Sequence, residues 1–300
     1  MMISTHKYAI ITATDKKYGD FLIDHWLNSL IDNINRNKVD IIVMDYGLDE
    51  EQKKKLLEKK VKVIACKKDG HVVNIRYRDI HKFLKNNYYE QIMNCDGGDI
   101  IFQKDITKLF EENKKEYRAV CEDLDKAASN MVEYALLRKC FVPKLAAKMI
   151  RLLEDKKPIN GGVILAPYKK FIKLCLNMEK MILNKNIYGP DQIILNYTLY
   201  STGFIKLDKT YNYTLFNSEI KFKIRNGVFF DENSNKIAIV HNSGATSLFR
   251  VIRNFGYGEG YNQIKPLSFF IFNLYYKIFD LGLAIRLLRK SIGVVRNPFS

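Results

Sequence analysis

The chain has 300 residues, 47% of them hydrophobic, which is enough for the core of one large domain. Its 49 basic and 33 acidic residues give a formal net charge of +16, which favours anionic partners. Five cysteines without a Cys-x-x-Cys pair argue against a disulfide framework, so we expect reduced core thiols in a cytosolic protein. We expect no signal peptide, because the apolar run 8–13 is too short for one.

In the first half of the chain, short apolar runs rich in β-branched residues alternate with helical periodicities. We expect strands at 8–14, 39–44, 61–65, 89–95 and 117–121, with helices at 21–31, from 49 onward, at 76–84 and at 106–110. This alternation predicts an α/β fold with a mostly parallel central sheet and helices on both faces. Residues 124–142 show no clear period, and we expect them to form a loop over the cleft.

The second half is less regular. We expect helices at 143–154, 171–183 and 192–199, a strand at 160–165, and short strands near 204–207, 219–224, 227–230 and 237–241. We assign residues 1–262 to one α/β domain and 263–300 to a basic, aromatic tail.

The tail combines an apolar run, 267–285, with one polar stripe formed by Asn273, Lys277 and Asp280. From Lys265 onward it carries six basic residues and one acid. This pattern favours an amphipathic helix lying on an anionic membrane, which would make the protein peripheral on the inner face of the cell membrane. The alternatives are a helix docked on its own domain, or one that spans the membrane or binds a partner.

Two aspartates follow a buried strand in the sequence Asp96-Gly97-Gly98-Asp99. Carboxylates at the end of a buried strand need a partner, since desolvating an unpaired charge is costly. A divalent cation, bound at the same time by a phosphate, would neutralise both carboxylates. The alternative is a strand-end turn with two solvated aspartates.

Other polar residues are expected at strand ends, where ligands bind in open parallel sheets. Asp15 follows the first strand, Glu122 and Asp123 follow another, and His241 ends a late apolar run. Imidazole with two carboxylates suits manganese or a similar ion. A lone histidine there is otherwise a hydrogen-bonded surface residue.

These motifs, in this order, resemble glycosyltransferases of the GT-A fold. The likeness covers about residues 8–250 and is closest to family 8, which includes bacterial lipopolysaccharide galactosyl- and glucosyltransferases. The motifs are an Ala-x-Asp strand end, the aspartate pair before an apolar strand, an Asn-x-Gly-Val-x-Leu strand at 160–165, an Asp-Gln helix start at 191–192 and a late stretch around Val240, His241 and Gly244.

The resemblance implies a role for each matching residue. Asp96, Asp99 and His241 would hold Mn²⁺ or Mg²⁺ against the diphosphate of a UDP-sugar. The remaining roles are uracil contact by Ala13 and Asp15, donor binding by Arg78, lining of the sugar pocket by Asn160, contact near the anomeric carbon by Asp191 and Gln192, and close phosphate approach at Gly244.

The chain departs from the family pattern in two places. The family has one residue between its aspartates, whereas this chain has Gly97 and Gly98, so Asp96 fits only with a bulge. The family's late motif continues into a lysine that contacts the diphosphate, and here only Arg250 or Arg253 could replace it.

The expected reaction is hexose transfer, of galactose or glucose, from a UDP-sugar to a glycan or glycolipid hydroxyl, with retention implied by the resemblance. Asp191 is the available carboxylate for a double displacement. A front-face path needs no nucleophile, and the sequence does not choose between them. The alternatives are a metal-dependent nucleic-acid binder or nuclease, disfavoured because the basic residues are dispersed, and an inactive glycosyltransferase-like binding protein.

Overall fold

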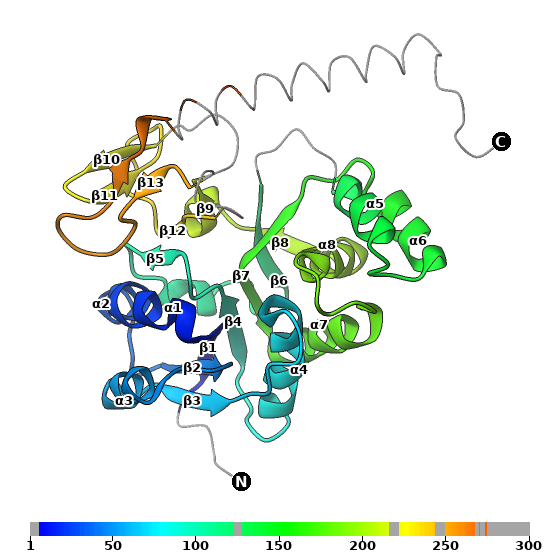
Figure 1. Cartoon of the computed structure of the whole chain (residues 1–300), viewed down its shortest axis with the longest axis horizontal. Coiled ribbons are helices and arrows are strands. Elements are labelled where there is room, and N and C mark those ends of the chain that lie inside the picture. Colours follow the sequence, from blue (N-terminus) through cyan, green and yellow to red (C-terminus); the bar gives the residue numbers. More distant parts are fainter. Residues whose placement is uncertain are drawn as a thin grey trace.

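A computed structural model describes residues 6–122, 128–215, 222–243 and 250–267, together with 270 and 274. Its centre is a seven-stranded sheet of order β3-β2-β1-β4-β7-β6-β8 (Figure 1). The strands are β1 (Tyr8–Thr14), β2 (Val39–Asp45), β3 (Lys62–Ala65), β4 (Gln91–Cys95), β6 (Tyr117–Cys121), β7 (Ile159–Pro167) and β8 (Phe204–Lys206). All are parallel except β7, which runs antiparallel to both β4 and β6. The predicted mostly parallel α/β sheet is therefore confirmed.

Helices cover both faces of this sheet (Figure 1). On one face, a continuous helical stretch packs beside α3 (Glu50–Glu58) over the apolar cluster that includes Trp26. That stretch comprises α1 (Lys16–Phe21), the π-helical η1 (Leu22–Leu27) and α2 (Asn28–Asp32). The opposite face carries α4 (Val72–Leu84), α5 (Ser129–Leu137), α6 (Pro143–Leu153), α7 (Tyr168–Met181) and α8 (Pro190–Thr202).

A second, three-stranded sheet lies beside the first, in the order β5-β12-β9. It consists of β5 (Ile100–Phe102), β9 (Tyr213–Thr214) and β12 (Ile239–His241). The short helices η2 (Thr107–Phe110) and η3 (Lys209–Asn212) lie near it in the chain. Two hairpin-like pairs complete the described fold, β10 (Lys223–Arg225) with β11 (Val228–Phe230), and β13 (Ile252–Arg253) with β14 (Gln263–Ile264).

Several sequence expectations need correction. Residues 124–142 were expected to be a loop, but 129–137 form α5, whose almost continuous apolar run hides a helical period. Helix α4 begins at Val72 rather than residue 76, and the first helix begins at Lys16 rather than residue 21. The paired strand β14 lies just beyond the predicted domain boundary at 262.

Five free cysteines agree with the expected reduced thiols. Within the described part of the chain, no helix is long and apolar enough to cross a membrane. Apart from residues 263–267, 270 and 274, the predicted tail lies outside the described residues, as does Gly244.

Candidate metal and donor site

The segment Asp96–Asp99 carries the chain from the large sheet into the small one. Asp96 directly follows β4, and its main-chain N–H donates to the carbonyl oxygen of Gly162 in β7 at 3.0 Å. Asp99 directly precedes β5, and its carbonyl oxygen accepts from the N–H of Asn242 at 2.8 Å. The bulge between the two aspartates is therefore held at both ends by main-chain hydrogen bonds.

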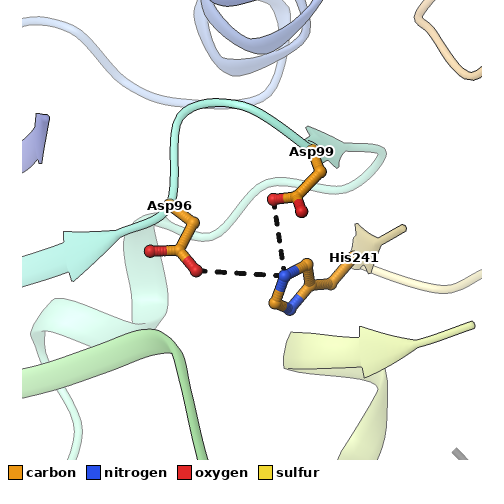
Figure 2. Close-up of side chains that lie close together, drawn as sticks. All are labelled: Asp96, Asp99 and His241. Atoms are coloured by element: carbon orange, nitrogen blue, oxygen red, sulfur yellow. Dashed lines mark ion pairs between the residues drawn. The ribbon is translucent and has the colours of Figure 1, made fainter. Parts of the chain in front are cut away.

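The small sheet places His241 beside this segment. In the antiparallel pair β5–β12, His241 lies opposite Ile100, the residue after Asp99. Its Nε2 is 3.4 Å from Oδ1 of Asp99 and 3.9 Å from Oδ2 of Asp96 (Figure 2). One ligand atom from each residue lies within 4.8 Å of the others. Residues about 145 positions apart in sequence thus converge on one point.

The three side chains fit a divalent cation. His241 is buried, and the aspartates are partly buried. Burial lowers the pKa of His241, but the facing carboxylates of Asp99 and Asp96 outweigh it, so the pKa is raised overall. A pocket that attracts a proton onto its imidazole attracts a metal cation for the same electrostatic reason. Two carboxylate oxygens and one imidazole nitrogen are a donor set that Mn²⁺ accepts.

An arginine of α4 links this cluster to Asp191. The Nη1 of Arg76 is 2.5 Å from Oδ1 of Asp96, and its Nη2 is 3.5 Å from Oδ2 of Asp191. Arg76 and Asp191 are both buried. Burial raises the pKa of Asp191 to about 6, against the lowering effect of Arg76. Asp191 is therefore a buried carboxyl group beside the candidate metal site, with a pKa well above that of an exposed aspartate.

The structure places Arg78, the arginine suggested by the resemblance, elsewhere. Its guanidinium pairs with Asp69 at 2.7 Å and with Asp79 at 2.6 Å. Arg76, which the sequence analysis missed, is the α4 arginine that meets Asp96 and Asp191. The sequence does mark Arg76, because this arginine lies in the apolar stripe of Val73, Ile80 and Phe83 at helical spacing and is therefore expected to be buried.

Asn160 and Gln192 lie along the same edge of the sheet. Because β7 is antiparallel to its neighbours, its first residues lie beside the carboxyl ends of β4 and β6. The side chain of Asn160 donates to Glu122 at 2.6 Å and accepts from the N–H of Gly162 at 2.8 Å. Gln192, in the first turn of α8, donates weakly to the sulfur of Met131 at 3.8 Å.

Ala13 and Asp15 occupy the end of β1. Asp15 caps α1, with Oδ1 accepting from the N–H of Lys17 at 3.1 Å. Its other oxygen pairs with Lys68 at 2.8 Å. Near the aspartate segment, an ideal Cβ placed on Gly98 would lie 2.9 Å from the ring of Tyr18, so this partly exposed ring flanks the aspartates. Tyr18 belongs to none of the sequence motifs.

Arg250 supplies a second cation at this site. Its Nη2 is 3.3 Å from Oδ2 of Asp99. Arg253, the other residue considered as a substitute for the missing lysine, lies exposed in β13. Arg250 is therefore the basic side chain that approaches the aspartates from the late motif.

Solved structures similar to this chain include the following three. A WbbM bifunctional glycosyltransferase, in its apo form, matches with 14% identity and a TM-score of 0.54, over 82% of this chain and 47% of that one. An active-site mutant of LgtC matches with 13% identity and a TM-score of 0.52, over 80% and 89%. The galactosyltransferase LgtC in complex with donor and acceptor sugar analogues matches with 13% identity and a TM-score of 0.53, over 80% and 88%.

This chain thus spans less than half the length of WbbM but most of LgtC. No protein-family model matches it, and its sequence matches no curated protein. At these identities the likeness establishes the fold, and the expected GT-A fold is confirmed.

Proposed function

We propose that this protein is a metal-dependent glycosyltransferase that moves a hexose, galactose or glucose, from a UDP-sugar to a hydroxyl of a lipopolysaccharide or other surface glycan. The observation that carries the proposal is the convergence of Asp96, Asp99 and His241 at the carboxyl edge of a GT-A sheet. This edge is where open α/β sheets bind their ligands. The neighbour LgtC is described as a galactosyltransferase bound to donor and acceptor sugar analogues, which supports the substrate class.

The chemical difficulty in this reaction is the negative charge that develops on the departing diphosphate. A divalent cation held by Asp96, Asp99 and His241, Mn²⁺ or Mg²⁺, would supply the Lewis-acid neutralisation of that charge. Arg250, 3.3 Å from Asp99, is placed to donate to a phosphate oxygen. Each such charge-stabilising contact is worth about a hundredfold in rate.

The remaining predicted residues bind the donor. Ala13 and Asp15 would contact the uracil from the end of β1, and Gly244 would let the backbone approach the phosphates. Arg76, rather than Arg78, takes the donor-binding role on α4, because it already bridges Asp96 and Asp191. Asn160 and Gln192 would line the sugar pocket.

We propose retention at the anomeric carbon, with two possible roles for Asp191. In a double displacement its carboxylate attacks that carbon and expels UDP, and the acceptor hydroxyl then displaces the carboxylate while its proton passes to the released diphosphate. In a front-face path it only stabilises positive charge on the sugar, while the leaving phosphate takes the acceptor proton. Because its pKa is raised to about 6, either role requires Asp191 to lose its proton near neutral pH.

We also propose that residues 263–300 hold the enzyme on the inner face of the membrane, where a lipid-anchored acceptor is within reach. Flotation with anionic liposomes tests this. The full chain should float, and a chain lacking 266–300 should not. Unchanged flotation of the shortened chain would exclude the tail as the anchor.

The reaction is tested with UDP-glucose, UDP-galactose and their N-acetyl forms, with and without Mn²⁺. We expect one donor to raise the melting temperature only with Mn²⁺, and to release UDP in the presence of an acceptor. A nuclease would cleave DNA or RNA with Mn²⁺ and ignore all four donors. An inactive relative would be stabilised by a donor yet release no UDP.

A further inference from the structure

A chain of buried amides runs from Glu122 to His241 behind the candidate metal site. Asn160 donates its Nδ2 to Oε1 of Glu122 at 2.6 Å. Asn212 donates its Nδ2 to Oδ1 of Asn160 at 2.9 Å. The Oδ1 of Asn212 then lies 3.0 Å from Nδ1 of His241. Asn160, Asn212 and His241 are each at most 6% exposed, so no bulk solvent substitutes for these contacts.

The orientation of each amide in this hydrogen-bond network is fixed by which of the neighbouring atoms donate and which accept. The carboxylate of Glu122 only accepts hydrogen bonds, so Asn160 must turn its NH₂ group toward it. The main-chain N–H of Gly162 only donates, and it points at the other atom of the same amide, at 2.8 Å. Both contacts require the oxygen of Asn160 to face Asn212. Asn212 must then present its own NH₂ to Asn160 and its oxygen to His241.

An oxygen facing Nδ1 requires that Nδ1 carry the proton. The neutral imidazole therefore has its lone pair on Nε2, the atom that faces Asp99 at 3.4 Å and Asp96 at 3.9 Å. This is the tautomer that a cation at the site needs, because only an unprotonated ring nitrogen binds a metal.

Gly162 leaves room for the His241 ring and for Asn160 because it has no side chain. An ideal Cβ built there would lie 2.4 Å from Cε1 and 2.6 Å from Nδ1 of His241, and 2.9 Å from Oδ1 of Asn160. Any larger residue would push the imidazole away from the aspartates or break its contact with Asn212. The same residue accepts from the N–H of Asp96, so it touches both parts of the site.

We infer that Glu122, Asn160 and Asn212 are positioning residues that set the tautomer and orientation of His241 for metal binding, with Gly162 providing the space. The inference rests on the proposed metal site and adds to it the residues that prepare its imidazole. Asn160 keeps one N–H beyond these contacts, so lining the sugar pocket and positioning His241 are compatible roles.

The decisive comparison is between Asn212→Ala and Asn212→Asp. Alanine removes the acceptor that faces Nδ1. Aspartate keeps an acceptor there but loses the donor to Asn160. We expect Asn212→Ala to weaken Mn²⁺ binding about 10–100-fold, the usual cost of losing such an outer contact. Asn212→Asp should recover most of that affinity. Free Mn²⁺ is counted by electron paramagnetic resonance, without any UDP-sugar.

Controls separate positioning from general damage to the fold. Asn262 is also buried and bonds main-chain groups of Gly227 and Gly256, outside the network, so Asn262→Ala should leave Mn²⁺ affinity unchanged at whatever cost in melting temperature. If Asn212→Ala does not fold, Gly162→Ala tests the same imidazole and should weaken binding similarly.

A second measurement reads the tautomer directly. With ¹⁵N-labelled histidine in the metal-free protein, at a pH where the imidazole is neutral, the His241 resonance, identified by its loss in His241→Gln, should show a proton on Nδ1. In Asn212→Ala the two tautomers should mix. A variant that is merely less stable would leave this signature unchanged.

The possible failures are distinct. Wild-type Mn²⁺ affinity in Asn212→Ala, or equal losses in the alanine and aspartate variants, would overturn the positioning role alone. No Mn²⁺ binding by the wild-type protein would overturn the metal site and this inference together. Normal Mn²⁺ binding without transfer from any UDP-sugar would overturn the proposed reaction and leave the positioning role standing.

Discussion

The two edges of the central sheet use the same kinds of residue in opposite ways. At the amino edge, Asp40 in β2 receives hydrogen bonds from His6 at 2.7 Å, Lys62 at 2.7 Å and Tyr89 at 2.8 Å. Burial raises its pKa, but these contacts outweigh burial and hold the pKa below its usual value. The single carboxylate is surrounded by donors, and the fold gains from its charge.

At the carboxyl edge the balance is reversed. Asp96, Asp99 and Asp191 converge there, and their ion-pair partners among the described residues are Arg76, Arg250 and, when it is protonated, His241. The pKa of Asp191 is raised to about 6 by burial, so its charge costs the fold free energy. We propose that the amino edge, whose charges are balanced, serves stability, whereas the crowded carboxylates of the carboxyl edge serve to bind a cation.

The sharpest test of this contrast replaces Asp99 by its neutral isostere. We expect Asp99→Asn to lower Mn²⁺-dependent transfer about a hundredfold or more, since the change removes charge but not shape. The measurement is the initial rate of UDP release, with Mn²⁺ affinity measured alongside. Full activity in this variant would mean that the carboxyl edge is no more functional than the amino edge.

The next effect is on stability. The folded-state pKa of Asp191, about 6, lies above the ordinary aspartate value of 3.8 that we take for the unfolded chain. As pH rises between these values the unfolded chain releases a proton that the folded protein keeps, so stability falls across that window and stays lower above it. The loss should be on the order of 2–3 kcal/mol. Urea unfolding of the metal-free protein from pH 4 to 7 should show this slope, and Asp191→Asn should remove it.

A smaller effect should separate two neighbouring arginines. Arg76→Lys keeps the charge but cannot bridge Asp96 and Asp191, and should reduce kcat/KM about tenfold. Arg78→Lys, at a side chain already paired with Asp69 and Asp79, should change kcat/KM little. Steady-state kinetics on both variants decides the assignment, and the reverse ranking would return the donor role to Arg78.

The smallest effect concerns the amino edge. Asp40→Asn should cost about 1 kcal/mol at pH 7, because His6 and Lys62, its two basic partners, are partly exposed and screened. A depressed pKa contributes stability above the unfolded value that is lost as pH falls through the folded one. The difference from wild type should therefore vanish in acid below that value. Transfer activity should be unchanged, and a loss of activity would contradict the division between the edges.

Much of the fold was predictable from local pattern. The alternation of buried strands with helices gave the α/β class, because parallel strands covered on both faces are continuous apolar runs. The direction of β7 was not predictable, since an apolar run indicates a buried strand but not whether that strand is parallel or antiparallel to its neighbours. That reversal brings Asn160 to the carboxyl edge, where the sequence analysis could not place it. Helix α5 was missed because its almost continuous apolar run hides the helical period.

The order of the motifs was enough to predict the metal ligands of the candidate site. It was not enough to predict which arginine of α4 faces the site, because that depends on the rotation of the helix. Asp96, Asp99 and His241 were named together from the sequence, and the structure brings them within reach of one ion. Arg76 and Arg78 are two residues apart, so they point about 200° apart around α4. Only the packing of α4 shows that Arg76 is the one facing Asp96. Asn212 carries no motif that would have marked it.

The turn Asp96–Asp99 belongs to one sheet at its start and to another at its end. A metal ion bound by this turn and by His241 would close a loop of nearly half the chain. It would also connect two sheets that share no strand. Such an ion binds only the folded protein, so it would stabilise the fold as well as take part in catalysis. Removing the ion should loosen the small sheet first, and hydrogen exchange in β12 should quicken before exchange in β1.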